Sequence, residues 1–575
     1  MKIKASDFIA TYLESKGITT VFELTGGMIT HLLDSFYLKT KVKIISMHHE
    51  QAAAFAADAC GRVSRLPGIA MATSGPGATN LLTGIASCYF DSSPAIFITG
   101  QVNISELKGE RAIRQLGFQE TDIVTMANVI TKKSYLVTDA NDLPAIMEEA
   151  FELSTSGRPG PVLIDIPMNI QREFINVKAN SKKKSIKSVK IDNAILSQLF
   201  AAISASKQPL ILLGRGIKTT SLSKELQTFL KITQVPVVTS LLGLDAIDYH
   251  SKQRAGFIGS YGNRWANIAL GECDLLIVLG SRLDIRQTGA DTRFFENRTI
   301  YHVDCEVGEI NNRVKGCVSI VAELKSFLES FNKKYAGKLI DKKTAWYQSI
   351  NSLRKKWPDD KELTCTGINP NHFMHVLSQQ SKESKAYIAD VGAHQMWAAQ
   401  SLEIQKNQLF LTSGGMGAMG FALPAAIGAS FSFDKKSVVA IIGDGSMQIN
   451  LQELQTIVRN KLPIKIIVVN NESLGMITQF QQSYFEERYQ STLWGYTAPD
   501  FKKIGLAYGI PSKTITKTNQ ISDAVNWMWN KENKNKAVLL QVMIAPLTNI
   551  FPKIAFGKPL TEMEPFAKPI EMEST

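Results

Sequence analysis

The chain has 575 residues, of which 44% are hydrophobic and 20% charged, and its 64 Lys and Arg against 52 Asp and Glu give a net charge of +12. This length excludes a peptide or a lone binding module, and at roughly 100–200 residues per domain it predicts three to five folded domains. The composition is that of an ordinary globular protein and excludes a disordered or collagen-like chain.

The first residues show an amphipathic helix pattern, with the apolar side chains between Phe8 and Leu13 on one side, and no secretory signal pattern. We therefore expect a cytoplasmic protein. The six cysteines form no CxxC pair and no regular spacing. This fits a reducing compartment and predicts neither a disulfide framework nor a zinc site.

A second helix, rich in alanine, is predicted from His48 to about Arg65, and Glu50 lies at its start. The helix macrodipole favours a carboxylate at this place. Taken alone, Glu50 is therefore most simply a surface residue that stabilises the helix end.

Short runs rich in Val, Ile and Leu, ending near Gly, Ser, Asp or Asn, alternate with helical patterns along the whole chain. Such runs are typical of buried parallel strands in βαβ units. The predicted fold class is therefore α/β with doubly wound parallel sheets. The clearest predicted strands are Gly68–Thr73, Ala95–Thr99, Val162–Ile166, Pro209–Leu213, Leu275–Leu279, Val438–Ile442 and Ile464–Val469.

Polar stretches at residues 171–190 and about 333–369 are read as linkers that divide this pattern into blocks. The first stretch holds the only dense basic cluster, Lys182–Lys184, which predicts a solvated linker rather than a nucleic-acid site. The uncharged stretch between Lys406 and Asp434 is broken by glycines and Pro424, so it is read as a loop entering a helix and not as a membrane span. The expected blocks are 1–175, 190–345 and 365–550, followed by an extended tail at 551–575.

The third block carries the most specific motif. The strand ending at Ile442 is followed by Gly443-Asp444-Gly445-Ser446, and the next strand by Asn470-Asn471. Because one crossover helix joins these strands, Asp444 and Asn471 are expected at neighbouring carboxyl ends, where open α/β sheets bind ligands. A carboxylate and an amide oxygen suit Mg²⁺, and glycines at a helix start suit phosphate groups. A single GDG also occurs in plain turns, but the paired asparagines favour a site.

Here the sequence resembles the thiamine diphosphate (ThDP) enzymes, whose cofactor motif is GDG followed by NN about one helix and one strand later. The resemblance implies that Asp444, the side chain of Asn471 and the carbonyl of Ser473 hold Mg²⁺. It implies three doubly wound domains: pyrimidine-binding, central and diphosphate-binding. The residues that it places against the cofactor diphosphate and nearby are Gly392, Ala393, His394, Gly417, Gly443, Asp444, Gly445 and Ser446.

The same resemblance gives Glu50 and Met419 specific roles. Enzymes of this kind use one glutamate to hydrogen-bond the pyrimidine ring, which favours the tautomer that activates the thiazolium carbon; Glu50 matches it. The organic chemistry belongs to the cofactor, while the protein supplies shape and a carboxylate. Met419 matches the bulky apolar residue that holds the cofactor in a V shape, although core packing is the default role of methionine.

Nearly the whole chain is similar to the acetohydroxyacid (acetolactate) synthase large subunits. The segments that carry this likeness are Gly26-Gly27, His49-Glu50-Gln51, Thr73–Gly77, Phe118-Gln119-Glu120, Gly157–Pro161, Gln395–Gln400 and Gly420–Ala429. The likeness implies that Gly27, Phe118, Gln119 and Arg286 face substrate, with Arg286 pairing with the carboxylate of an acceptor keto acid.

In the middle block, glycine turns and arginines look like the flavin-binding segments of these synthases, where FAD performs no net redox reaction. The alternative is a vestigial domain that binds nothing. The residues implied in FAD binding are Gly214, Arg215, Gly216, Ser240, Leu241, Arg282, Arg286 and Asp304.

Several positions depart from the family pattern. Met28, Met168 and Phe480 stand where the family usually has a small residue, Lys and Trp. The loop Ser105–Gly117 looks longer than in the family and carries Lys108, Glu110, Arg111 and Arg114. These charges are either simply solvated or form a basic rim for a large acceptor such as a nucleotide-linked keto-sugar, as in carboligases associated with branched-chain sugar synthesis.

The function expected from the resemblance is decarboxylation of pyruvate, followed by ligation of the two-carbon unit to an acceptor carbonyl. The acceptor is a second pyruvate, giving 2-acetolactate, or another ketone such as a nucleotide-linked deoxy-keto-sugar. A catalytically silent cofactor-binding partner is a third hypothesis, which the intact Glu50, Asp444 and Asn471 disfavour. Because the family builds each site from two subunits, we expect a homodimer or homotetramer, with no nucleic-acid or membrane partner.

Overall fold

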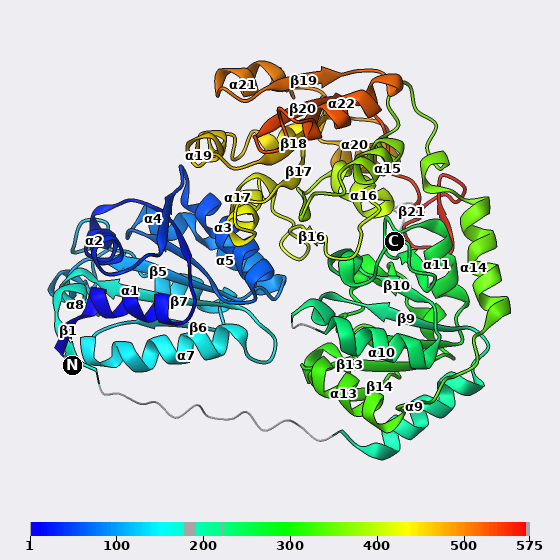
Figure 1. Ribbon diagram of the computed structural model, residues 1–575, viewed down its shortest axis with the longest axis horizontal. Helices are drawn as coiled ribbons and strands as arrows, with labels where there is room; N and C mark the ends of the chain where they lie inside the picture. Colours follow the sequence, from blue (N-terminus) through cyan, green and yellow to red (C-terminus); the bar gives the residue numbers. More distant parts are fainter. Residues whose placement is uncertain (1, 178–190, 220–221, 571–575) are drawn as a thin grey trace.

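The computed structural model describes residues 2–177, 191–219 and 222–570, so the Lys182–Lys184 cluster lies outside the described residues. Three α/β units follow one another along the chain, each built on a six-stranded sheet whose neighbouring strands are all parallel (Figure 1). This confirms the predicted doubly wound class. All seven strands predicted above are present, with bounds that differ by at most two residues at either end.

The first unit contains the helix predicted at Glu50. Its sheet has the order β3 (Lys43–Ser46), β2 (Thr20–Leu24), β4 (Gly68–Ala72), β5 (Ala95–Gln101), β7 (Pro161–Pro167), β6 (Lys133–Leu136). Its main helices are α1 (Ala5–Ser15), α2 (Thr30–Lys39), α3 (Glu50–Ser64), α5 (Leu82–Phe90) and α7 (Leu143–Thr155). Strands β4, β5 and β7 are buried along their whole length, as apolar runs covered by helices on both faces should be.

The middle unit repeats this plan. Its sheet has the order β11 (Arg254–Phe257), β10 (Val237–Thr239), β9 (Pro209–Leu213), β12 (Leu275–Leu279), β13 (Thr299–Asp304), β14 (Val318–Val321). Its helices include α9 (Asn193–Ala205), α10 (Ser223–Thr233), α11 (Arg264–Glu272) and α13 (Leu324–Lys334). The second polar stretch was read only as a linker, but it also contains helix α14 (Thr344–Lys356), which buries Trp346 and Ile350 against this unit.

The third unit carries the GDG motif. Its sheet has the order β16 (Leu409–Leu411), β15 (Ala386–Ala389), β17 (Val438–Gly443), β18 (Ile464–Asn470), β20 (Val538–Met543), β19 (Ser512–Ile515). Its helices include α15 (Pro370–Gln380), α16 (Ala393–Ser401), α17 (Ala422–Ser432), α18 (Asp444–Met447), α19 (Glu453–Arg459), α20 (Gly475–Tyr484), α21 (Phe501–Ala507) and α22 (Ile521–Trp529). In the tail, β21 (Lys553–Ile554) and β22 (Met563–Glu564) form a small antiparallel pair.

The strand order reverses between β2 and β4 in the first sheet, between β9 and β12 in the second, and between β15 and β17 in the third. At such a switch point the loops leaving two neighbouring strands diverge and leave a crevice at the carboxyl ends. The first and third units also pack directly on each other through α3 and α17 (Figure 1). A Cβ added at Gly428 would lie 2.0 Å from the carbonyl oxygen of Ala56, so the two helix backbones meet without intervening side chains.

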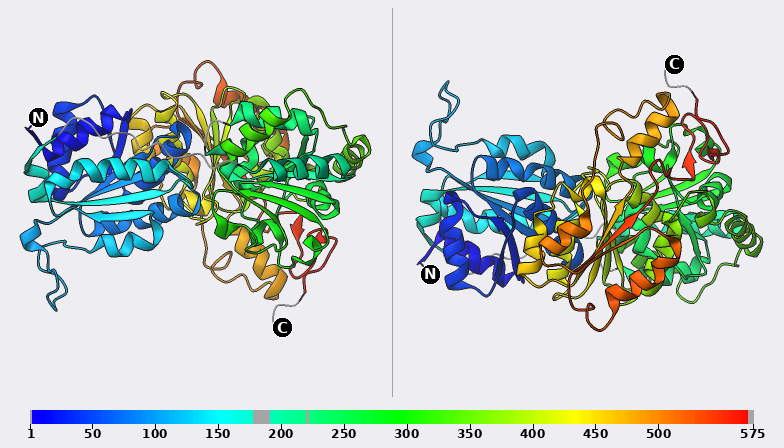
Figure 2. Two further views of the ribbon diagram at one scale, coloured as in Figure 1. Left: turned by 90° about the horizontal axis from the view of Figure 1, so that it is seen from below. Right: turned by 90° about the horizontal axis from the view of Figure 1, so that it is seen from above.

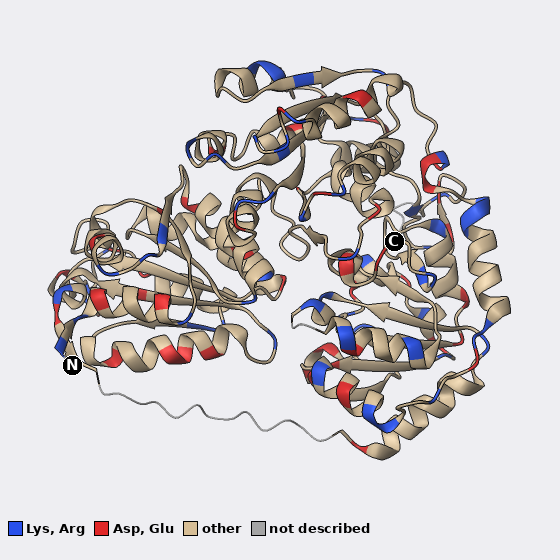
Figure 3. Cartoon of the chain, viewed as in Figure 1, with Lys and Arg blue, Asp and Glu red and all other residues tan. Residues whose placement is uncertain are grey.

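Charged residues of both signs are interspersed along all three units (Figure 3). Among the described residues, no helix is both long and apolar enough to cross a membrane.

Candidate active site

Three oxygen atoms converge where β17 and β18 end. The Asn471 side-chain oxygen faces Asp444 Oδ1 at 3.3 Å and the carbonyl oxygen of Ser473 at 2.9 Å. Oxygens that face one another without a proton between them repel, and turning the amide over would remove this repulsion. A bound cation removes it equally, and a carboxylate, an amide and a carbonyl are ligands that suit Mg²⁺. Asp444 Oδ2, also buried, has no hydrogen-bond partner, so these residues fit a magnesium ion.

Within the described residues no group of three or more His, Cys, Asp or Glu side chains could hold a metal. The site at Asp444 contains a single carboxylate and therefore does not form such a group. Burial raises the pKa of Asp444 to about 6, and the Tyr496 hydroxyl beside it opposes this shift. A bound cation would stabilise the ionised form of Asp444.

The diphosphate candidates lie at the switch point of the third sheet, after β15 and β17. His394 Nε2 accepts a hydrogen bond from the backbone N–H of Gly443 at 3.1 Å, and burial lowers the pKa of His394 to about 3. The ring is therefore neutral, with its proton on Nδ1. A Cβ at Gly392, whose φ is +154°, would lie 2.7 Å from this ring, so only glycine fits beside it. Ala393 begins α16 here, which adds backbone donors suited to a phosphate.

Met419 lies against the same motif: its Cε would be 3.2 Å from a Cβ at Gly445. The turn that carries Met419 begins at Gly417, where φ is +65°, and is held by the buried Asp390. The Asp390 carboxylate accepts hydrogen bonds from the backbone N–H groups of Gly420 at 2.9 Å and Ala422 at 2.7 Å. Ser446 donates to the carbonyl of Val391 at 3.0 Å and closes the crevice between β15 and β17.

Glu50 is 6% exposed at the first turn of α3, so it is not the surface residue that the sequence alone suggests. Its Oε2 accepts a hydrogen bond from Asn80 Nδ2 at 2.9 Å. Its Oε1 lies 3.4 Å from where a Cβ at Gly77 would be. A neighbour without a side chain thus keeps open the space in front of this oxygen.

The other candidates of the first unit lie at the carboxyl edge of its sheet. Gln119 has φ +64° and packs on Gly75. A Cβ added at Gly75 would lie 3.1 Å from the Cβ of Gln119. Phe118 is 80% exposed, and Gly27 is exposed with nothing within 4 Å of a Cβ. The loop before Phe118 projects from the unit (Figure 2) and is closed by Glu120, which accepts from Lys108 N at 2.6 Å and Leu116 N at 2.8 Å.

A cavity of about 430 Å³ opens beside the switch point of the middle sheet. Gly214 follows β9 there, and a Cβ at Gly214 would meet the Gly280 carbonyl at 2.1 Å. Burial lowers the pKa of Arg215 to about 10, and within the described residues this guanidinium forms no ion pair. The remaining flavin candidates also line the cavity, namely Gly216, Ser240, Leu241, Arg282, Arg286 and Asp304.

The candidates thus form three groups, one at the carboxyl edge of each sheet. Glu50 and Gln119 belong to the first unit, and the metal and diphosphate residues to the third. No hydrogen bond joins the Glu50 carboxylate to Met419 or Asp444 in the described part of this chain. Arg286 lines the middle cavity, apart from Gln119. Phe480, which departs from the family pattern, packs against Tyr484 with ring centroids 4.8 Å apart and ring planes tilted by 55°.

Three residues near these groups were not predicted: Asn80, Asp390 and Tyr496. Asp390 ends the strand before Gly392, and an aspartate at a strand end was the one signal that could have found it. Asn80 and Tyr496 act through contacts with residues distant in the sequence, which no local pattern reveals.

Three family models of thiamine pyrophosphate (thiamine diphosphate) enzymes match the chain. They are the N-terminal TPP binding domain at residues 3–126, the central domain at 196–331 and the C-terminal TPP binding domain at 390–542.

Full-length relatives are similar over almost the whole chain. Acetolactate synthase 2, chloroplastic, of Nicotiana tabacum is 36% identical over 96% of this chain and 84% of its own. The acetolactate synthase isozyme 2 large subunit of Escherichia coli is 35% identical over 98% of this chain and 99% of its own. The acetolactate synthase large subunit of Pyropia yezoensis is 36% identical over 96% of this chain and 94% of its own.

Proposed function

Because the chain belongs to the acetolactate synthase large-subunit family of thiamine diphosphate enzymes, we propose that it decarboxylates pyruvate and ligates the two-carbon unit to an acceptor carbonyl. The observation that carries this proposal is the trio of converging oxygens beside the glycine cradle of the third sheet. A chain of this family that had lost catalysis would have no need to keep these oxygens together with a buried Glu50.

When bound, thiamine diphosphate supplies a thiazolium carbon that acts as a nucleophile once deprotonated. Asp444, Asn471 and the Ser473 carbonyl hold Mg²⁺, and the residues from Gly392 to His394 hold the diphosphate. Glu50 accepts a hydrogen bond from the pyrimidine ring, in the space that Gly77 leaves open. Met419 packs against the cofactor, and Gln119 and Arg286, with Gly27 and Phe118 beside them, orient substrate.

Each of the three blocks binds a different group. Residues 1–175 bind the pyrimidine ring, 365–550 the diphosphate, and 190–345 an FAD molecule. FAD is supported by the cavity at β9 and β12 and by Arg215, an unpaired guanidinium suited to a phosphate group.

The active protein is a homodimer or homotetramer. Glu50 and Asp444 lie in different units, and no hydrogen bond joins them among the residues described, which supports a site completed by a second copy. Exposed apolar side chains on the first unit, Phe118, Met126 and Val129, offer that copy a surface to cover.

Pyruvate is the acceptor that Arg286 favours, since a guanidinium fork suits a carboxylate. The projecting loop favours a second candidate, a nucleotide-linked deoxy-keto-sugar. Its Lys108, Arg111 and Arg114 are partly or fully exposed, and Glu120 fixes both ends of the loop as a rim. Such a rim suits a diphosphate-bearing acceptor.

Product analysis tests both candidates. The purified protein is incubated with pyruvate, thiamine diphosphate, Mg²⁺ and FAD, and CO₂ and 2-acetolactate are measured together. We expect one CO₂ for each 2-acetolactate. Slow CO₂ release without acetolactate, accelerated by a nucleotide-linked keto-sugar, would identify the second acceptor. No CO₂ release under any of these conditions would contradict the proposed function.

A further inference from the structure

The three units meet at one segment, Thr412–Gly415, which leads to Met419; Thr412 and Ser413 are buried, and Gly415 is exposed. A Cβ at Gly414 would lie 2.9 Å from Leu242 of the middle unit, and a Cβ at Gly415 would lie 2.6 Å from Phe90 of the first unit. The segment belongs to the third unit and is enclosed by the other two. Gly414 and Gly415 also line the middle cavity.

Asp91 holds this segment from the first unit. Its Oδ2 accepts a hydrogen bond from Gly414 N at 2.9 Å, and its Oδ1 accepts one from Gly415 N at 2.6 Å. Arg62 lies 3.0 Å from Asp91 Oδ2 and donates to the carbonyl of Thr412 at 2.8 Å. The side chains of Arg62 and Asp91 are 2% and 0% exposed. These paired, buried groups form one connected network, so a shift of Asp91 is transmitted to Arg62 and to the Thr412–Gly415 backbone.

The segment in turn contacts the neighbours of two residues proposed to bind thiamine diphosphate, Met419 and His394. Ser413 Oγ accepts a hydrogen bond from Ala418 N at 3.2 Å, directly before Met419. Gln395, which follows His394, donates to Thr412 Oγ1 at 2.6 Å. A displacement of this segment would therefore move the residues proposed to hold thiamine diphosphate.

Asp91 also contacts the middle cavity. Its backbone carbonyl accepts a hydrogen bond from Arg215 Nε at 3.2 Å. The remaining guanidinium nitrogens of Arg215 form no hydrogen bond to the described residues, so they can bind an anion in the cavity. An anion there would fix Arg215, and with it the backbone of Asp91.

We propose that Asp91 is a positioning residue that couples the two cofactor sites, so that FAD in the middle cavity and thiamine diphosphate at Asp444 strengthen each other's binding. The inference rests on the cofactors proposed above. Its physical basis is that either ligand orders the same Asp91 network, and the entropy lost in that ordering is lost only once. The strengthening is reciprocal, because coupling between two binding sites is a single free energy.

Binding measurements without pyruvate test this coupling apart from turnover. Titration calorimetry gives the Kd of thiamine diphosphate with Mg²⁺, with and without FAD, and the Kd of FAD with and without thiamine diphosphate. For the unmodified protein we expect each Kd to fall about tenfold when the other cofactor is present. In Asp91→Asn, which loses one of two carboxylate oxygens and its charge, we expect both ratios to approach 1.

Asp91→Asn could unfold the protein, because breaking a buried ion pair is strongly destabilising. Ser413→Ala removes the hydroxyl contacts with Ala418 N and with Ser87 Oγ and leaves the Asp91 carboxylate in place, and we expect it to keep FAD affinity and lose the coupling. Ser512, a buried serine of β19, lies outside this network, so Ser512→Ala is the matched control. We expect it to keep the tenfold ratio between the Kd values measured with and without the other cofactor. Binding of both cofactors without coupling, or full coupling in Ser413→Ala and in folded Asp91→Asn, overturns the proposal. Failure of either cofactor to bind the unmodified protein refutes the proposed function instead.

Discussion

Asn471 shows how a single residue can indicate an absent ligand. Its oxygen faces two other oxygens, at 3.3 Å on Asp444 and 2.9 Å on Ser473, while Asp444 Oδ2 has no partner. Buried polar atoms in proteins are almost always paired, so this arrangement implies either a turned amide or a bound cation, and the three oxygens are ligands that suit Mg²⁺. The sequence predicted Asp444 and Asn471 because each follows a strand. It could not reveal that the Asn471 amide turns toward Ser473.

Asn471→Ala tests this reading. With two of three protein oxygens left, we expect the Mg²⁺ concentration needed for half-maximal thiamine diphosphate binding to rise at least about tenfold, with binding restored at high Mg²⁺. A fluorescence titration of the cofactor at a series of Mg²⁺ concentrations measures this. Asn141→Ala, at an exposed helix start, is the control and keeps the original Mg²⁺ dependence. An unchanged midpoint in Asn471→Ala would exclude its side chain as a ligand.

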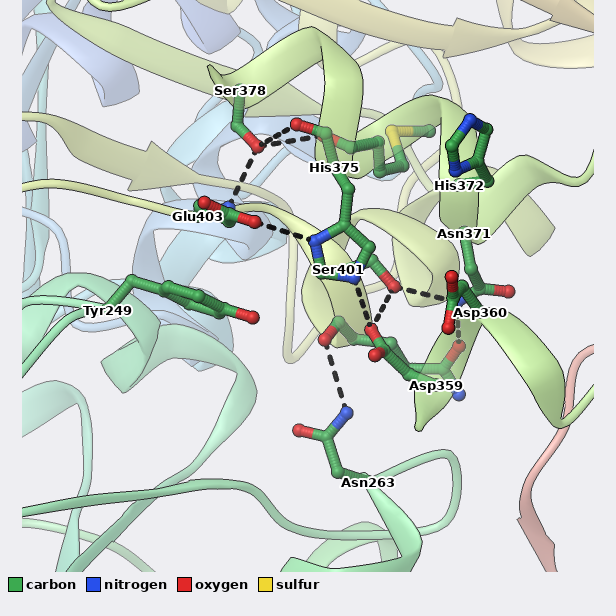
Figure 4. Close-up of polar contacts among 12 residues, drawn as sticks. Tyr249, Asn263, Asp359, Asp360, Asn371, His372, His375, Ser378, Ser401 and Glu403 are labelled. Carbon is green, nitrogen blue, oxygen red and sulfur yellow. Dashed lines mark hydrogen bonds and ion pairs between the residues drawn. The ribbon is translucent and has the colours of Figure 1, made fainter. Parts of the chain in front are cut away.

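Helix α15 is fixed to the rest of the third unit by His375. Its Nε2 lies 3.0 Å from Asp359 Oδ2 and its Nδ1 lies 3.0 Å from Glu403 Oε1 (Figure 4). Ser401 donates to the same Asp359 oxygen, and His250 Nε2 lies 3.8 Å from Glu403 Oε2. Burial alone would lower the pKa of His375, but hydrogen bonds and charges from both carboxylates outweigh it and raise the pKa to about 9.

This shift makes stability depend on pH. The pKa of His375 is higher in the folded than in the unfolded chain, so its contribution is complete below about pH 6.5 and is lost as the pH rises through about 9. Between pH 7 and pH 10 the free energy of unfolding should fall by about 2 kcal/mol more in the original protein than in His375→Gln. Urea unfolding of both proteins across this range is the measurement. Parallel pH curves would show that His375 is neutral in the folded state.

The helices and strands were predicted correctly where the hydrophobic pattern is clear, either as a short apolar run or with a helical period. Strands such as Leu275–Leu279 are uniformly apolar because both faces are covered, and α3 begins at Glu50, two residues after the predicted start at His48. Helix α14 was missed because its polar surface dominates the composition, and only a few side chains such as Trp346 mark its buried face.

At the scale of the whole molecule, the units are joined by surfaces that no local pattern records. The contact of α3 with α17 depends on small residues, since Gly428 meets the backbone of Ala56. The Asp91 junction joins residues more than 300 positions apart. The sequence predicted three sheets and their ligand edges, but these junctions arise only when the units pack.

Gly428→Ala tests the helix contact. The added Cβ would overlap the Ala56 carbonyl, so we expect destabilisation of about 3 kcal/mol, the upper end for overpacked cores. Gly308→Ala, with nothing within 4 Å of its Cβ, should change stability by less than about 0.5 kcal/mol. Thermal unfolding of both variants measures the difference. Equal melting temperatures of Gly428→Ala and Gly308→Ala would mean that α3 and α17 can move apart to accept the added Cβ.

The proposed reaction depends on Glu50, which activates a thiamine diphosphate cofactor for pyruvate decarboxylation. The most direct measurement compares CO₂ release from pyruvate by the original protein and by Glu50→Gln, each loaded with thiamine diphosphate, Mg²⁺ and FAD. We predict that the variant keeps its melting temperature and its affinity for the cofactor, because the diphosphate and metal residues are untouched, and that its CO₂ release is abolished. A variant that releases CO₂ at the original rate would contradict the account.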